Sequence, residues 1–146
     1  MGTHRIIGTT QEAISDAEND LKMTFPLSFR NWLLSNNGSN LQDFTMYPVM
    51  DHRDKRKTWD SIVRRYREDW LSWISHFPKK REELMNLLPF ADCGTGDFFC
   101  FDYNHKILSK EIPVVFWDHE TGEYKQVAES FLDFANRAIT GEYSVI

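Results

Sequence analysis

The chain has 146 residues and a formal net charge of −5, and aromatic side chains make up 14% of it. This length suits one domain that buries roughly two-thirds of its unfolded surface, so it needs neither disulfides nor a structural metal to fold. Apolar runs fall short of the ~18 residues of a membrane span, and residues 1–10 lack the pattern of a signal peptide. We therefore expect a cytoplasmic protein with no membrane partner.

Charge is distributed unevenly along the chain. Residues 51–67 carry seven Lys or Arg and three Asp or Glu, a balance of +4. Residues 89–146 carry four basic and ten acidic side chains, a balance of −6. An acidic surface attracts basic partners and repels nucleic acid. We therefore expect a protein partner and no nucleic-acid partner.

The N-terminal third of the chain predicts two helices. Thr9 and Glu12 have the spacing of a capping box, with Thr9 as the N-cap. Apolar side chains in residues 13–21 then recur on one helical face. Pro26 suits the first turn of a second helix, and the Asn-Asn-Gly sequence at residues 36–38 provides a stop signal.

The middle of the chain predicts a short strand and then the longest helix. Residues 44–49 alternate in hydropathy, and Pro48 favours an edge position because it lacks a backbone donor. Apolar side chains recur at helical spacing over residues 58–77, and Pro78 ends this helix. A short helix is expected at residues 80–85.

After residue 86 the hydrophobic period changes from that of a helix to that of strands. Short turns between successive strands predict an antiparallel meander. A last helix is expected from its N-cap Ser130 to Gly141. The expected strands are residues 87–91, 98–102, 113–117 and 124–128, and the turns are residues 93–96, 103–106 and 120–123.

Helices that precede a group of strands, followed by one closing helix, indicate an α+β protein rather than an alternating α/β protein. Neither a repeat nor a linker interrupts the sequence, so we expect a single domain over residues 1–146. The helices are expected to cover one face of a mainly antiparallel sheet. The other face, or part of it, would be left for solvent or a partner.

Four blocks of the sequence, in this order, resemble the SUKH superfamily, which includes the yeast cell-wall assembly regulator domain and many bacterial immunity proteins. The resemblance spans about residues 9–141, and residues 51–81 depart from it as a basic helical insert. The blocks are the opening helices (14–38), the strand–turn–strand core (88–102), the next strand (113–120) and the start of the closing helix (130–134).

The resemblance implies an α+β fold and, in bacteria, neutralisation of a polymorphic toxin by direct binding. Many such toxins end in a nuclease domain. We therefore expect an immunity protein, or antitoxin, that binds a cognate toxin with a basic nuclease domain and has no enzymatic activity of its own. The alternative is a non-catalytic regulatory or scaffold domain like the yeast relative. The resemblance implies no cofactor.

Three features that could suggest chemistry have simpler structural explanations. Residues 118–120 (Asp-His-Glu) are strand neighbours whose side chains alternate in direction, which favours an ordered turn over an acid–base site. Residues 94–96 (Gly-Thr-Gly) precede a strand, which favours a hairpin turn over a phosphate loop. A zinc site needs tighter spacing and more ligands than Cys93 and Cys100 offer, so we expect buried free thiols, with a disulfide or a metal site as the alternatives. The sequence thus predicts neither catalytic nor metal-binding residues.

Two surfaces are candidates for partner binding. Acidic residues near the turns of the meander are either solvated turn residues or a negative surface that mimics nucleic acid and blocks a nuclease. The basic helix, with Arg64, Arg65 and Trp70, is a solvated face, a contact for an acidic patch of another chain, or a nucleic-acid contact. The edge strand also leaves a homodimer open. The acidic candidates are Asp92, Asp97, Asp118, Glu120 and Glu123.

Overall fold

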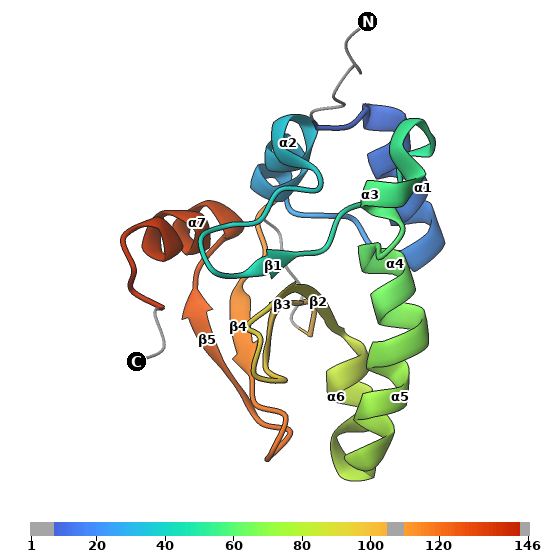
Figure 1. Cartoon of the computed structure of the whole chain (residues 1–146). Helices are drawn as coiled ribbons and strands as arrows, with labels where there is room; N and C mark the ends of the chain where they lie inside the picture. The colour runs from blue at the N-terminus through green and yellow to red at the C-terminus, as the bar shows by residue number, and fades with distance from the viewer. Residues whose placement is uncertain (1–7, 105–109, 144–146) are drawn as a thin grey trace, which may run out of the picture.

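The computed structural model describes residues 8–104 and 110–143. Figure 1 shows a sheet in the centre with helices packed around it. The sheet has five antiparallel strands in the order β1-β2-β3-β4-β5, which confirms the meander and places the strand expected within residues 44–49 at an edge. The strands are β1 (Thr45–Met46), β2 (Leu87–Asp92), β3 (Phe98–Asp102), β4 (Val114–Trp117) and β5 (Tyr124–Ala128).

The helices confirm the α+β class, because most of them precede β2 and one closes the chain. In the described part of the chain, none is long and apolar enough to cross a membrane. The turn predicted at residues 103–106 lies partly outside the described residues. The helices are α1 (Gln11–Leu21), α2 (Leu27–Asn36), α3 (Lys55–Thr58), α4 (Ile62–Arg64), α5 (Leu71–Trp73), α6 (Arg81–Met85) and α7 (Phe131–Ile139). Three 3-10 helices are η1 (His52–Asp54), η3 (Ile74–His76) and η4 (Pro78–Lys80), and η2 (Arg65–Trp70) is a π-helix.

The N-cap of α1 is Thr10, and the prediction of Thr9 was wrong by one residue. The Thr10 side chain accepts a hydrogen bond from the backbone N–H of Ala13 at 3.1 Å. Thr9 is instead buried, and its hydroxyl donates to a carboxylate oxygen of Asp51 at 2.7 Å. The long-range hydrogen bond to Asp51 therefore engages the side chain that local spacing assigned to the N-cap.

The long helix begins later than expected. Its N-cap is Ser61, whose side chain accepts a hydrogen bond from the N–H of Arg64 at 3.2 Å. Thr58, the expected first residue, ends the separate helix α3. From Ile62 the helical run α4-η2-α5-η3 continues to His76, and its η2 part is π-helical. A π segment widens the helix by one residue per turn, which changes the face that later side chains occupy.

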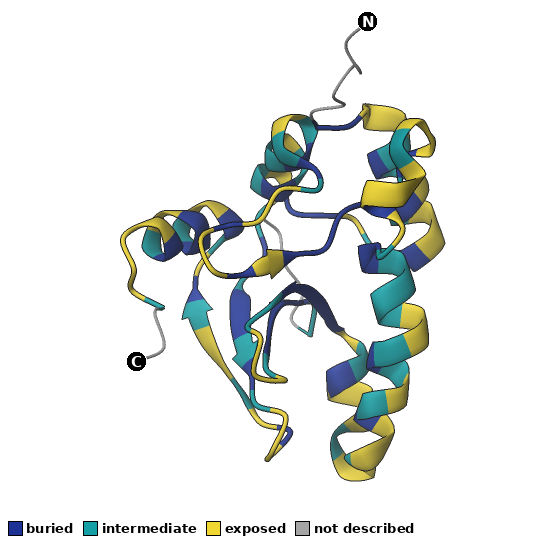
Figure 2. Ribbon diagram, in the orientation of Figure 1, coloured by how far each residue is buried: buried dark blue, intermediate teal, exposed yellow. Residues whose placement is uncertain are grey.

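Helices pack against both faces of the sheet, so the expectation of one covered face was wrong. Successive strand residues point to opposite faces. Phe99 contacts Phe134 of α7, with ring centroids 4.7 Å apart, whereas its neighbour Phe98 contacts Trp73 of α5 at 5.0 Å. Figure 2 shows the central strands buried and β5 with the hairpin tip exposed. The accessible parts of the sheet are therefore its β5 edge, its turns and Thr45 on the β1 edge.

Candidate partner-binding surfaces

The two hairpin turns of the meander lie at the same end of the sheet. The β2–β3 turn contacts the β4–β5 turn through His119, whose backbone N–H donates to Asp97 at 3.0 Å and whose Nδ1 lies 2.7 Å from the same oxygen. Strand order thus brings together acidic residues that the sequence could not place relative to one another. We call this set the acidic hairpin end. It comprises Asp92, Asp97, Asp118, Glu120 and Glu123.

Asp97 and His119 stabilise each other's charged forms. Partial burial raises the pKa of Asp97, but hydrogen bonds from His119 and from the hydroxyl of Thr95 outweigh it, and the net pKa is lowered. The hydrogen bond to Asp97 in turn raises the pKa of the exposed His119. The pair holds one turn against the other and determines how the surrounding carboxylates are presented.

The members of the acidic hairpin end have two roles. Asp92 accepts a hydrogen bond from the N–H of Gly94 at 2.6 Å, and Asp118 accepts one from the N–H of Glu120 at 2.8 Å. These aspartates order their turns, as expected for residues at such positions. The side chains of Glu120 and Glu123 are exposed and reach into solvent.

The acidic hairpin end has little basic charge of its own to neutralise it. Lys80 lies 3.8 Å from Glu123, and His119 pairs with Asp97. Within residues 8–104 and 110–143, neither Lys nor Arg forms an ion pair with Asp92, Asp97, Asp118 or Glu120. Its negative charge is therefore available to a partner.

Asp97, Asp118 and His119 each offer one possible metal-ligand atom, and these atoms lie within 4.8 Å of one another. The hydrogen bonds that order the two turns already account for this proximity. We therefore assign no metal to the cluster.

Two arginines of the basic helix, Arg64 and Arg65, are paired within their own segment. Arg64 contacts Asp60 at 2.9 Å and Glu68 at 3.0 Å, and Arg65 contacts Asp60 at 2.7 Å and Asp69 at 3.1 Å. The side chains of the two arginines are 28% and 25% exposed. Unlike most carboxylates of the acidic hairpin end, these two arginines already have partners of opposite charge.

Trp70 is fully buried, so its place among the partner-binding candidates was wrong. Its indole N–H donates to the backbone oxygen of Leu84 at 2.9 Å, and its ring packs on Trp117 at 4.8 Å. Trp70 shares a buried stripe with Ile62 and Ile74, which is a signal that the sequence contained. The exposed tryptophan of this segment is Trp59, at 58%.

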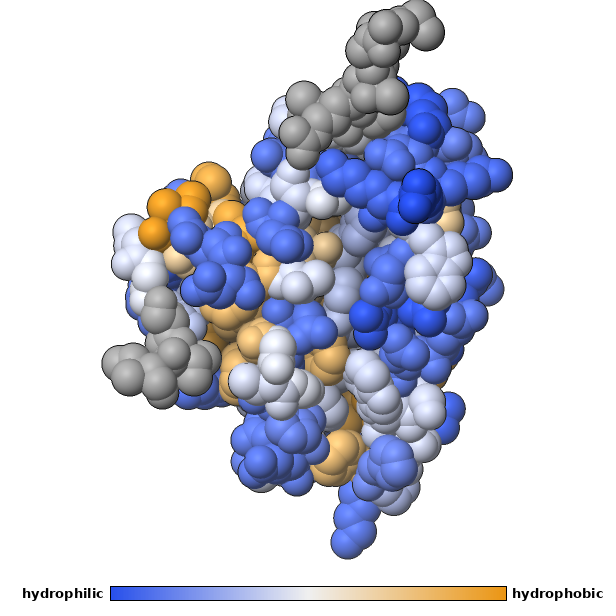
Figure 3. Space-filling model, viewed as in Figure 1, coloured by the Kyte–Doolittle hydropathy of each residue, from blue (hydrophilic) through white to orange (hydrophobic). Residues whose placement is uncertain are grey.

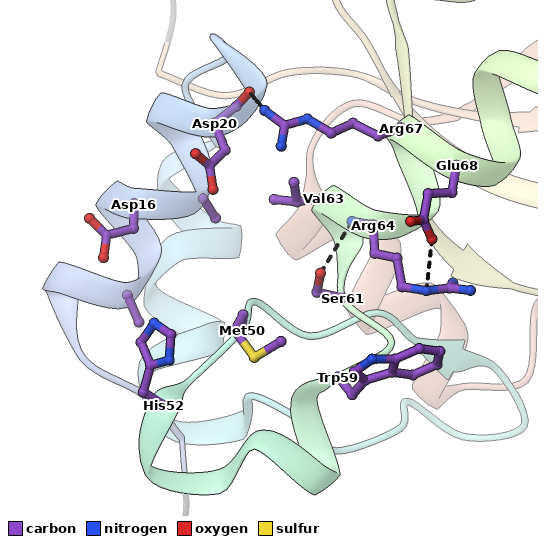
Figure 4. Close-up of a pocket in the computed structure, with 12 residues that line it drawn as sticks. Asp16, Asp20, Met50, His52, Trp59, Ser61, Val63, Arg64, Arg67 and Glu68 are labelled. Atoms are coloured by element: carbon purple, nitrogen blue, oxygen red, sulfur yellow. Dashed lines mark hydrogen bonds and ion pairs between the residues drawn. The ribbon is translucent and has the colours of Figure 1, made fainter.

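A groove of about 430 Å³ separates α1 from the start of the long helix. Figure 4 shows Asp16 and Asp20 of α1 on one side and Arg64, Arg67 and Glu68 on the other. Arg67 closes one end by donating to the backbone oxygen of Asp20 at 2.7 Å. Charges of both signs line this groove, so it does not favour one sign of partner charge.

A second hollow, of about 310 Å³, lies between the long helix and the hairpin turns, and sequence analysis missed it. We call it the aromatic hollow. Figure 3 shows apolar side chains between the hairpin turns and α5, and a mostly hydrophilic surface over α1 and α3. The indole N–H of Trp117, in the wall of the hollow, is buried and has no hydrogen-bond partner among the described residues. The lining residues are Trp73, His76, Phe77, Gly96, Phe98, Trp117 and His119.

Cys93 and Cys100 are free thiols, as expected. Burial, together with the charges of Asp97 and Asp92, raises the pKa of Cys93 to about 12. Burial also raises the pKa of Cys100. Both thiols therefore stay protonated near neutral pH and are poor nucleophiles.

Comparison with known proteins supports the resemblance of the four sequence blocks to the SUKH superfamily. A search of curated proteins found no match to this chain. A family model described as the SMI1 / KNR4 family (SUKH-1) matches residues 8–137, which include the helices α1 and α2, the whole sheet and most of α7. The chain therefore belongs to the SMI1 / KNR4 family (SUKH-1).

Proposed function

We propose that this protein is an immunity protein that acts in the cytoplasm by binding a cognate polymorphic toxin, with a basic nuclease domain as the partner. Membership of the SUKH-1 family is consistent with such a role. The proposed mechanism is occlusion: the toxin's active surface is covered, and the immunity protein carries out no reaction.

The observation that carries this proposal is the acidic hairpin end. It gathers five carboxylates at and beside the two hairpin turns, with Glu120 and Glu123 exposed, and pairs few of them with cations among the described residues. Complementary charge accelerates association with a basic partner and disfavours partners of like charge. A nuclease active site is built to bind phosphates, so a rigid set of carboxylates is suited to occupy it.

The geometry at His119 supports a binding role over catalysis. In a hydrolase triad the imidazole lies between the hydroxyl and the carboxylate and takes the hydroxyl's proton. Here the hydroxyl of Thr95 donates to Asp97 at 3.0 Å, and the Nδ1 of His119 is occupied by that same carboxylate. Here the Asp97 carboxylate lies between the Thr95 hydroxyl and the His119 imidazole. The imidazole therefore does not contact the hydroxyl that it would have to activate.

The direct test is co-expression with the toxin encoded beside this protein's gene. We expect growth to be restored and a complex to form at micromolar protein. Continued killing, together with the absence of a complex at that concentration, would contradict the proposal. The competing assignment is a regulatory or scaffold domain, which the same family would also accommodate. It predicts that no toxin gene lies next to this one.

A further inference from the structure

We propose that the outer face of α7 is a contact between two copies of this chain, whose α7 helices pack against each other antiparallel. This inference goes beyond the proposed function and does not depend on it. We call the face the α7 seam, and it comprises Leu132, Asn136 and Ile139. Figure 1 shows α7 at the opposite end of β5 from the β4–β5 turn, so a dimer formed there leaves the acidic hairpin end free.

The α7 seam is apolar at both ends although it faces solvent. The side chains of Leu132 and Ile139 are 59% and 58% exposed. Two of the four large apolar side chains that are exposed among the described residues therefore lie on this one short helix. Figure 3 shows apolar side chains gathered over α7. Exposed apolar side chains that are grouped on one face, rather than scattered singly, indicate an interaction site.

Helical spacing places the three seam residues in one row. Each residue of an α-helix is turned by about 100° from the one before it, so the three lie within about 60° of one another around the axis. Phe134 and Ala138 lie on the other side of the helix and are buried. Asn136 is exposed, and its side-chain amide has no hydrogen-bond partner among the described residues.

The order of apolar, amide and apolar side chains is the same in both directions along the helix. In an antiparallel pair with its two-fold axis near Asn136, Leu132 of one copy meets Ile139 of the other, and the two Asn136 amides face each other. An amide carries both donors and an acceptor, so two copies of it can pair. A two-fold symmetric contact needs such a self-complementary surface.

The charges beside the seam also match an antiparallel pair. Asp133 and Arg137 flank the same side of the seam and form an ion pair of 2.9 Å within one chain. In an antiparallel pair equal flanks meet, so Asp133 of each copy lies opposite Arg137 of the other, and such flanking pairs determine helix orientation. The Arg137 guanidinium uses Nε for Asp133 and Nη1 for Glu142, which leaves Nη2 without a partner among the described residues.

The contact is small, so we expect a weak dimer. α7 has 9 residues, and each copy contributes one such helix. A contact of this kind is smaller than the roughly 1,200 Å² that stable interfaces bury, which places it among transient interactions. We expect a dissociation constant on the order of 100 μM.

Sedimentation velocity of the full chain measures this association directly. The weight-average mass should rise from 17.3 kDa toward twice that value as the concentration is raised from about 5 μM to about 500 μM. Ile139→Asp places a charge in the seam and should weaken self-association about tenfold. Trp59→Asp is the matched control, because Trp59 is also 58% exposed but lies in the groove beside α1, and it should leave self-association unchanged.

A pair of charge variants tests the antiparallel geometry. Asp133→Lys makes both flanking positions positive and Arg137→Glu makes both negative, so each variant should self-associate about tenfold more weakly. Mixed in equal amounts, the two variants should form a heterodimer with wild-type affinity, since every positive position then meets a negative one. Damage to the helix would not be repaired by mixing, so recovery separates a contact between copies from a structural role.

Three results would overturn the proposal. The first is a single species of 17.3 kDa at about 500 μM; if Ile139→Asp then weakened the toxin complex, the occupant of the seam would be the toxin. The second is self-association that Trp59→Asp abolishes and Ile139→Asp spares. The third is failure of the mixed charge variants to associate, which would exclude the antiparallel pair. Sedimentation is measured without the toxin, so the proposed function can fail while the dimer stands.

Discussion

The acidic hairpin end and the start of the long helix are both densely charged, but their charges are arranged in opposite ways. In the helix, Arg64 and Arg65 are satisfied by Asp60, Glu68 and Asp69 from the same segment. At the hairpin turns, carboxylates of Asp92 and Asp118 accept hydrogen bonds from backbone N–H groups and form no ion pair with Lys or Arg of the described residues. The comparison teaches that charge density alone does not identify a binding surface. What matters is whether the charges are already paired.

The two regions also differ in what fixes them. The helix start is organised by local contacts three to five residues apart, such as those of Asp60 with Arg64 and Arg65. The hairpin end is organised by a contact across the sheet between Asp97 and His119. At the far end of the helix, Phe77 packs against Gly122, so the C-terminal end of the helix meets the hairpin turns there.

The largest expected effect comes from breaking that junction. Gly122→Ala would place a Cβ atom 2.5 Å from the Phe77 ring at a residue with φ +73. We expect the free energy of unfolding to fall by about 3 kcal/mol, from backbone strain plus steric overlap. Gly94→Ala is the matched control, since φ is +81 there but no atom lies within 4 Å of the added Cβ, and it should cost about 1 kcal/mol. Equal losses in urea unfolding would show that the Phe77 contact is unimportant.

The next effect concerns association with the toxin. Glu120→Lys reverses an exposed charge at the hairpin end, and we expect the association rate constant to fall about tenfold with a flatter dependence on salt. Glu12→Lys makes the same change on α1, at the opposite end of the molecule (Figure 1), and should have little effect. Stopped-flow measurements at low and high salt compare the two. A larger effect from Glu12→Lys would move the interface to the α1 groove.

A smaller effect is expected from the charge network of the helix. Asp60→Asn removes the carboxylate that Arg64 and Arg65 share, at a position whose side chain is 41% exposed. Because solvent screens such pairs, we expect a loss of about 1 kcal/mol in the free energy of unfolding, and a smaller loss in high salt. Toxin association should hardly change. Strong loss of binding without loss of stability would instead make this network part of the interface.

The smallest effect is the pH dependence of the Asp97–His119 pair. The raised pKa of His119 means that its stabilisation is present at low pH and is lost as pH rises through the folded-state pKa, above about 6.5. The lowered pKa of Asp97 means that its contribution is present above the ordinary aspartate pKa and is lost as pH falls through the folded value. The pair should therefore stabilise the hairpin end most between these limits.

Urea unfolding as a function of pH tests this expectation. The wild-type protein should lose a small amount of stability above about pH 6.5 that His119→Asn does not lose. His52→Asn, on the other side of the molecule, serves as the control. Identical pH profiles for the wild-type protein and His119→Asn would show that the pair contributes nothing measurable.

The sequence by itself determined the local structure of this protein. β3 and β5 were predicted to the residue, and the N-cap of α7 at Ser130 was correct. These features are encoded within a few residues, by hydrophobic period and by turn and cap chemistry. The motif order also identified the family, which the family model confirms. At the two wrongly predicted positions, Thr9 donates a hydrogen bond to the Asp51 carboxylate and Thr58 accepts one from the Asp51 backbone N–H, and Asp51 lies outside both local patterns.

Only the tertiary structure decided which of the charged and aromatic residues form a surface. Strand order placed Asp97 beside His119, 22 residues further along the chain, and helix packing on both sheet faces buried Trp70. The aromatic hollow draws its lining from α5, η3, β3, β4 and the two turns, so no sequence window contains it. The physical reason is that side-chain direction and element order are local properties, whereas a shared surface depends on how distant elements pack.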